Sequence, residues 1–138
     1  MARSAQLRRL SRRLDAIPKA AVRAVVPALI KSGDELAGRM RLLVPVDTGA
    51  LRESIAVTAP GQSTPPYSQP GGSTTAGENQ VLVTAGNTDV RYPHLVEYGT
   101  SDTAAQPFFW PAYRLNKKRL ANRIKRAVAK AVREEWRG

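Results

Sequence analysis

The stretch PAYRLNKKRLANRIKRAVAKAVREEW, Pro111 to Trp136, decides the fold class because it carries the clearest helical pattern in the chain. Apolar side chains recur along one face at helical spacing, and lysines and arginines occupy the opposite face. The apolar positions are Leu120, Ile124, Ala127, Val128, Ala131 and Val132. The stretch contains no internal glycine, and no proline follows its first residue. It therefore predicts one uninterrupted amphipathic helix.

A second helical pattern begins near the N-terminus. Apolar residues recur there at three- and four-residue spacing, at Leu7, Leu10, Leu14 and Ile17. Arginines at 8, 9, 12 and 13 lie between them. This pattern predicts an amphipathic helix whose polar face is basic. Pro18 fits the first turn of a continuing helix. The apolar stripe then runs on to about Val44 through Val22, Val25, Val26, Leu29, Ile30, Leu36, Met40 and Leu43. Pro27 should kink or break this helix, because its ring removes one backbone bond.

Two strands are predicted between the helical segments. Glu53 to Ala59 alternates, with Ile55 and Val57 on one face and Ser54, Ala56 and Thr58 on the other, and QVLVTA, Gln80 to Ala85, repeats the pattern. The region from Asp89 to Tyr98 supplies either a third strand or a short helix. At 138 residues the chain has room for one domain, which we take to be residues 1–138.

The predicted strands are separated by PGQSTPPYSQPGGSTTAGEN, residues 60–79, which is rich in Pro, Gly, Ser and Thr. With almost no apolar residues it cannot supply a packed core, and it is too long for a hairpin turn. We interpret this extended loop as either disordered or a projecting arm that orders on a partner. A tolerated insertion at a loop tip is an equal alternative.

Charge and composition limit the classes of function. The formal net charge is +11, and it is segregated: residues 1–58 are net +6, residues 107–138 net +8, and residues 59–106 net −3. Such an excess favours polyanions, nucleic acid first, although solvated helical surfaces also collect lysine and arginine. The chain has no cysteine, no apolar run near the roughly 20 residues that span a bilayer, and no secretory signal. We expect a soluble protein that is intracellular at synthesis.

Catalytic and metal-binding residues are scarce. The single histidine, His94, lies three residues before Glu97, and that spacing could place both on one helical face. Two ligands without a further His, Cys or Asp nearby make a poor metal site, so a structural role for His94 is favoured. Neither a cofactor nor an enzymatic activity is expected.

Three motifs have complete structural interpretations. In RYPHLVEYGT, residues 91–100, Pro93 suits the first position of a short helix and Gly99 a left-handed helix stop, while Arg91 could pair with Glu97 or with a neighbouring copy. In VPVDTGALRESI, residues 44–55, the Asp-Thr-Gly turn precedes the predicted strand. QPFFWPA, residues 106–112, sets three aromatics between prolines and predicts either a core plug or an interface anchor.

In this order, followed by a basic C-terminal helix, the three motifs resemble the small head–tail joining and tail-terminator proteins of long-tailed bacteriophages, prophages and gene-transfer particles. The resemblance implies an α+β fold, with a small antiparallel sheet flanked by the long N-terminal helix and the C-terminal helix. It also implies a ring of identical subunits, most often six, in the neck of the virion. There the ring would end tail polymerisation and contact a head connector or stopper protein and the tail tube protein.

Two sets of candidate residues follow. The motif residues expected at assembly interfaces are Asp47, Thr48, Gly49, Arg52, Tyr92, Glu97, Tyr98, Gly99, Pro107, Phe108, Phe109 and Trp110. If the helices face a DNA channel, the residues that would hold phosphates without regard to sequence are Lys117, Lys118, Arg119, Arg123, Lys125 and Arg126.

Two alternatives remain open. A non-specific nucleic-acid-binding protein would explain the net charge, but the acidic middle with its aromatic cluster suits protein–protein contact better. A minor enzyme of phage assembly is disfavoured by the shortage of catalytic side chains.

Overall fold

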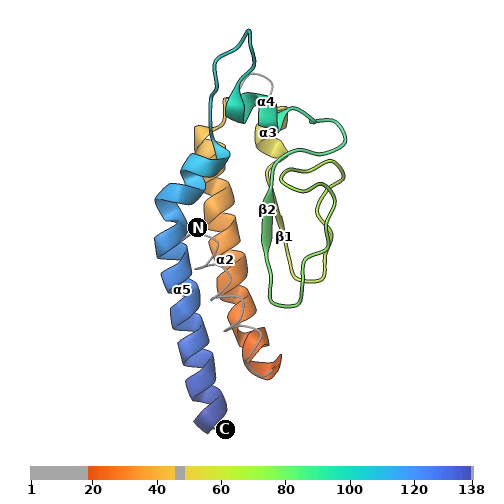
Figure 1. Ribbon diagram of the computed structural model, residues 1–138. Coiled ribbons are helices and arrows are strands. Elements are labelled where there is room, and N and C mark those ends of the chain that lie inside the picture. The colour runs from red at the N-terminus through yellow and green to blue at the C-terminus, as the bar shows by residue number, and fades with distance from the viewer. Residues whose placement is uncertain (1–18, 46–48, 138) are drawn as a thin grey trace.

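The computed structural model describes residues 19–45 and 49–137. Its framework is a pair of long helices, α2 (Lys19–Leu43) and α5 (Phe109–Arg137), which lie side by side and run in opposite directions (Figure 1). Both helices were predicted, and α5 begins slightly earlier than expected, at Phe109 rather than at Pro111. The helix predicted from Leu7 lies outside the described residues.

A kink or a break was predicted at Pro27; helix α2 continues through this residue, so the break does not occur. A proline deprives the carbonyl four residues earlier of its hydrogen bond, and that residue is Arg23. Pro27 and Arg23 are both exposed, so water can replace the missing bond. Val25 and Leu29, on either side of the proline, are buried and hold both halves of the helix against the same core.

The buried stripe of α2 departs from the prediction at its end. Leu43 was expected in the stripe but is 46% exposed, and its neighbour Leu42 is 72% exposed. Val44 takes the inward position instead, four residues after Met40, as helical spacing requires. The buried apolar residues of this segment are Ala21, Val25, Leu29, Ala37, Met40 and Val44.

An ion-pair cluster joins the two helices halfway along their length. Arg119 and Arg123 of α5 each approach the carboxylate of Glu35 to 2.9 Å, and Arg123 also reaches the hydroxyl of Ser32. Burial alone would raise the pKa of Glu35. The hydrogen bond and charge of Arg123, with the charges of Arg119 and Arg39, outweigh that effect and lower the pKa.

The sheet has two antiparallel strands, β1 (Ala56–Thr58) and β2 (Leu82–Thr84), which pair Ala56 with Thr84 and Thr58 with Leu82. The fold class is therefore α+β, as predicted. Both strands are shorter than expected. The first four residues of the ALRES run, Ala50–Glu53, form a helical turn, α3, so the strand predicted from Glu53 begins only at Ala56.

The sheet packs closely on α2 at Gly33. A Cβ atom there would lie 2.9 Å from Val81 Cγ1 and 3.0 Å from Val57 Cγ1, closer than such contacts allow. Val57, Val81 and Val83 therefore share the face that meets α2. The alternate residues Thr58 and Thr84 are buried on the opposite face.

Residues 60–79 cover that opposite face, beside the strands and away from the helices (Figure 1). The segment folds back on itself through a bridge between Ser63 and Thr75, and Gln69 exchanges two backbone hydrogen bonds with Ala85. Ser68 and Ala76 are buried. The predictions of disorder and of a projecting arm are wrong, because polar side chains and backbone groups bond one another and Ala85 here in place of an apolar core. A tolerated insertion stays a prediction.

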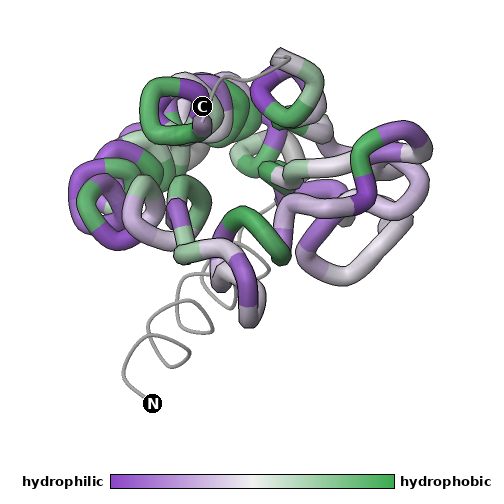
Figure 2. Tube along the Cα trace, turned by 90° about the horizontal axis from the view of Figure 1, so that it is seen from above, coloured by the Kyte–Doolittle hydropathy of each residue, from purple (hydrophilic) through white to green (hydrophobic). Residues whose placement is uncertain are grey.

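The core falls into two clusters. The upper cluster, near α3, centres on Met40, Ile55 and Phe108. The lower cluster contains Ala21, Val25, Leu29 and Ala131. In the view from above, much of the hydrophobic chain borders the centre of the molecule (Figure 2). Within residues 19–45 and 49–137, no helix is long and apolar enough to cross a membrane.

Candidate functional site

The RYPHLVEYGT stretch forms a short helix, α4 (Pro93–Tyr98), with Tyr92 before it and Pro93 in its first turn as predicted. The carboxylate of Glu97, which is only 7% exposed, accepts three backbone hydrogen bonds from the start of α5. Phe108 N and Phe109 N donate to Oε1 at 3.0 and 2.9 Å, and Trp110 N donates to Oε2 at 3.3 Å. These N–H groups would otherwise lack partners, and a negative charge at a helix N-terminus is favourable.

The capping bond makes one unit of two motifs that lie apart in the sequence. The spacing of His94 and Glu97 had suggested a shared site. The Glu97 carboxylate instead caps the N-terminus of α5. Among the described residues, no cluster of three or more His, Cys, Asp or Glu side chains could hold a metal ion. Arg91 does not pair with Glu97 within the segment, because its guanidinium lies 3.7 Å from the centre of the Tyr67 ring and bonds Thr88 O.

Gly99 ends α4 because the backbone of residues 103–105 passes too close to it for any side chain, which the sequence did not show. Its backbone has φ 77° and ψ 178°, a positive φ as predicted, but outside the left-handed helical region. A Cβ atom would lie 2.7 Å from Ala105 N and 2.9 Å from Thr103 O. The exposed loop of residues 100–107 closes over this position and is tied back by Gln106 N, which donates to Val96 O. Pro107 lies at the end of this exposed loop.

The PFFWP aromatics include the predicted core plug, whereas a role as an interface anchor stays a prediction. Phe108 is fully buried and plugs the upper cluster. Trp110 is half-buried, and its Nε1 donates to the hydroxyl of Tyr98 at 2.8 Å. Edge-to-face contacts connect Phe108, Phe109, Trp110 and Tyr113 in series, with ring centroids 5.0 to 6.3 Å apart. The aromatic series therefore extends from the core to the surface beside α4.

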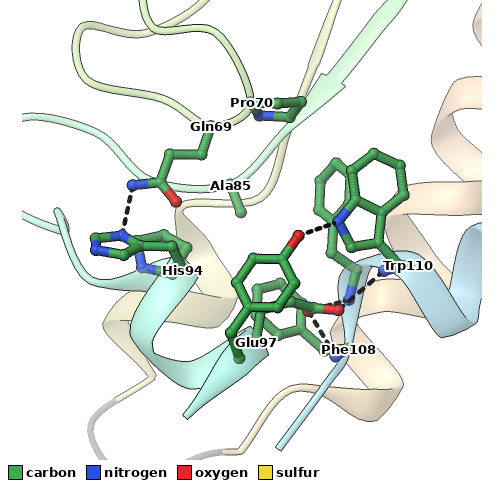
Figure 3. A pocket seen from close by; sticks show the side chains of 10 residues that line it. Gln69, Pro70, Ala85, His94, Glu97, Phe108 and Trp110 are labelled. Carbon is green, nitrogen blue, oxygen red and sulfur yellow. Dashed lines mark hydrogen bonds between the residues drawn. The ribbon is translucent and has the colours of Figure 1, made fainter. Parts of the chain in front are cut away.

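A pocket of about 180 Å³ opens at this surface. Figure 3 shows His94 and Gln69 on one side and Trp110 on the other, with Glu97 and Phe108 between them. Gln69 Nε2 donates to His94 Nδ1 at 2.9 Å, so the histidine connects α4 to the 60–79 segment. The remaining lining residues are Pro70, Ala85, Pro93, Tyr98 and Phe109. This mainly apolar, aromatic pocket suits an apolar side chain of a partner.

Exposed apolar residues gather around the same end of the molecule, which we call the α4 end. Tyr92, Leu95 and Tyr98 of the α4 region are 38%, 45% and 69% exposed. Leu42 and Leu43 lie at the adjoining end of α2, and Leu115, 81% exposed, in the second turn of α5 (Figure 1). Residues 19–36 of α2 and 116–134 of α5 expose no large apolar side chain.

The other candidate interface residues lie near the same end where they are described. Gly49, with φ 81°, precedes α3, and Arg52 on α3 is exposed. Asp47 and Thr48 lie outside the described residues. Sequence reasoning missed Ser54, whose buried hydroxyl accepts from Gly86 N and donates to Leu51 O, and Gln69. Ser54 lies within the VPVDTGALRESI motif, but nothing in that motif distinguishes it, and Gln69 belongs to none of the three motifs.

The six basic residues proposed to face DNA are divided by the structure. Lys118, Lys125 and Arg126 are exposed, whereas Lys117 is half-buried. Arg119 and Arg123 are engaged by Glu35. Exposed Lys130 and Arg133 continue the basic surface toward the C-terminal end. The polar face of α5 is thus strongly basic, and two of the six predicted residues also hold Glu35.

Comparison with known protein families gives a match over much of the chain. Residues 8–99, more than half of the chain, match the profile of a family described as "Bacteriophage HK97-gp10, putative tail-component". The match covers α2, the sheet, the 60–79 segment and α4. Neither the curated proteins nor the solved structures searched gave a match. The match agrees with the resemblance to phage tail proteins carried by the three motifs. The chain therefore belongs to the HK97 gp10-like family of bacteriophage tail components.

Proposed function

We propose that this tail component forms a ring of identical copies, six in number, at the head-proximal end of the tail tube. The ring ends tube polymerisation and joins the tail to the connector or stopper protein of the filled head. Its role is structural and not catalytic. The observation that carries the proposal is the gathering of exposed apolar residues around the aromatic pocket at the α4 end.

A surface of this kind favours a stable protein interface. Scattered exposed apolar residues are ordinary, but a group that surrounds a pocket at one end of a molecule marks an interaction site. Aromatic side chains held in fixed positions are preferred anchors in such sites. Here Glu97 fixes the start of α5, and the Tyr98–Trp110 bond fixes the two rings at the surface. The anchors are thus held in place before any partner binds.

The experiment replaces Leu95 and Leu115 with aspartate, singly, in a phage or particle whose own copy has been removed. Both side chains are exposed, so circular dichroism should report a folded protein for each variant. We expect overlong tails without heads, because an unpaired charge buried at an interface is strongly unfavourable. Ala129→Asp, at an exposed position on the shaft of α5, is the matched control. Normal tails in the Leu variants would overturn the proposal.

A second candidate function is non-specific binding of nucleic acid, favoured by the polar face of α5. From Arg114 to Arg133 this helix carries nine lysines and arginines and no acidic residue. In a ring, this charge could line the DNA channel; in a separate protein, it could coat a duplex. Either arrangement predicts an affinity for duplex DNA that falls steeply with salt. A plot of log association constant against log salt concentration should have a slope of roughly −0.9 per phosphate neutralised.

The variant that tests this surface changes Lys118, Lys125, Arg126 and Lys130 to glutamine and leaves the Glu35 ion pairs intact. Glutamine retains helix propensity, so the fold is maintained while charge is removed. Loss of DNA from complete particles supports the channel. Failure of tail joining with DNA retained places the charge at a protein interface instead. Loss of duplex binding by the isolated protein, with assembly unaffected, favours the coating function.

A further inference from the structure

An arginine beside the aromatic pocket is held in a fixed position by a tyrosine ring. The Arg91 guanidinium lies 3.7 Å from the centre of the Tyr67 ring, and its Nε donates to Thr88 O at 3.1 Å. Tyr67 has a φ of 62° and is the one described residue other than glycine with a positive φ. This conformation is unfavourable for a bulky side chain and persists only where the surrounding structure requires it. In this conformation the exposed tyrosine ring lies against the guanidinium.

The stacked pair adjoins the pocket. Gln69 and His94 line one side of the pocket and are hydrogen-bonded at 2.9 Å (Figure 3). Tyr67 lies two positions before Gln69, and Arg91 lies three before His94. Two or three residues span at most about 7 to 11 Å of chain. The two contacts therefore link the same two segments, and the guanidinium lies beside the histidine side of the pocket.

The Arg91 guanidinium keeps donor groups for a partner. Within residues 19–45 and 49–137, no hydrogen bond or ion pair engages its two terminal nitrogens. A guanidinium presents its paired N–H groups in a rigid fork that matches the oxygens of a carboxylate or a phosphate. Because the tyrosine ring already fixes its orientation, little side-chain entropy remains to be lost on binding.

We propose that the pocket and Arg91 together bind a segment of a different protein in which an apolar side chain stands next to a carboxylate. The inference rests on the proposed function, because it names the chemistry of a partner at the α4 end. The apolar side chain enters the pocket of about 180 Å³. A cavity of roughly 150 Å³ accepts a benzene ring, so one aromatic side chain fits. The carboxylate accepts hydrogen bonds from the Arg91 guanidinium at the rim.

The surrounding charge favours a protein carboxylate over the phosphates of nucleic acid. Residues 59–106 are net −3, and Arg91 is their only lysine or arginine. Asp89 and Asp102, which flank α4 in the sequence, are both exposed. Such a surface repels the continuous phosphates of a duplex, whereas a single carboxylate can pair with the one guanidinium.

A second copy of the chain does not offer the required chemistry on its described surface. Among the described residues, none of the exposed large apolar side chains adjoins an exposed acidic residue in the sequence. Arginines directly precede Leu42, Tyr92 and Leu115. Glu97 precedes Tyr98, but its carboxylate is buried and caps α5. The partner that complements Arg91 is therefore a different protein.

Two ligands that differ in one charge test the proposal on the full-length protein. N-acetyl-phenylalanine carries an apolar ring and a carboxylate, and N-acetyl-phenylalanine amide carries the same ring without the charge. Both should shift the NMR signal of the Trp110 indole N–H, because Trp110 lines the pocket. The carboxylate should bind about threefold more tightly than the amide, as expected for an exposed ion pair.

Arg91→Gln should abolish this preference and leave the affinity for the amide unchanged. Arg126→Gln, at an exposed position on α5, is the matched control and should keep the preference. The proposal fails if the parent binds neither ligand, or if the preference survives in Arg91→Gln. Equal binding of both ligands by the parent would also refute it, but the pocket would then remain available as the interface of the proposed function.

Particle assembly gives an independent measurement. In Arg91→Gln we expect the yield of particles with joined heads and tails to fall about threefold, because one exposed ion pair is lost. The oligomeric state of the purified protein, by mass photometry, and its affinity for duplex DNA should be unchanged. Loss of oligomers would assign the site to a second copy, and loss of duplex affinity would assign Arg91 to phosphate. Either result, or a normal yield of joined particles, would overturn the proposal.

Discussion

The helix pair has an upper half at the α4 end, which contains the cluster around Met40 and Phe108, and a lower half, which contains the cluster of Ala21, Val25, Leu29 and Ala131. The two halves are built differently, although the same two helices run through both. At the α4 end, Phe108 fills the core, Glu97 holds the start of α5, and leucines and tyrosines face solvent. In the lower half, alanines and valines form a thin core, and the exposed surface is basic. The α4 end is thus fixed by several side-chain contacts, as the proposed interface requires, whereas the lower half has a thinner core.

The largest expected effect comes from emptying the upper core. Phe108→Ala should lower the free energy of unfolding by about 3–5 kcal/mol, because it removes a fully buried ring and leaves a cavity. Ala131→Gly, in the lower cluster, removes one methyl group and adds backbone freedom within a helix, and should cost only about 1 kcal/mol. Urea denaturation of the two variants measures both values. Equal losses would show that the two halves are packed alike.

Removing the cap on α5 should have the next largest effect. Glu97→Ala leaves three amide groups without their acceptor at a largely buried helix start, at a cost of about 2–3 kcal/mol. Glu97→Gln keeps one oxygen to accept from Phe108 N and Phe109 N, and should recover most of that stability. Thermal unfolding distinguishes the two variants. If alanine were tolerated as well as glutamine, the α4 end would not depend on this carboxylate.

The ion-pair cluster between the halves should contribute less and should depend on pH. Because the folded pKa of Glu35 is lowered below its ordinary value of 4.5, its contribution is present above that pH and is lost as the pH falls through the folded pKa. With the carboxylate partly exposed, Glu35→Gln should cost at most about 1 kcal/mol near pH 7. The difference between parent and variant in urea should shrink toward pH 3. A difference that grows in acid would contradict this account.

The smallest expected effect is at the histidine. His94 is exposed and makes one described hydrogen bond, to Gln69, so His94→Ala should change stability by no more than about 0.5 kcal/mol. Tail assembly should continue. Particle yield and tail morphology by electron microscopy check this expectation. A turnover measured for the protein and abolished by this change would replace the structural role with a catalytic one.

Much of the framework was predictable from local pattern. The C-terminal helix, the second helix, both strands and the short helix after Tyr92 follow from spacing and from Pro93. The errors lie where packing against the core overrides the local signal. Pro27 stays within α2 because Val25 and Leu29 are anchored on the core, and Leu43 turns outward because Val44 occupies the next inward position. Residues 60–79 are ordered by hydrogen bonds to one another and to Ala85.

By itself, the sequence determined the two long helices α2 and α5, the presence of two strands, the segregation of charge and the three motifs, because each of these can be read from local sequence. Only the tertiary structure decided what those motifs do together. Glu97 meets Phe108, Gln69 meets His94, and Glu35 meets Arg123 across separations that no periodicity encodes. Such contacts depend on how the chain packs as a whole, because bringing distant residues together costs loop-closure entropy that only the packed core and its hydrogen bonds offset.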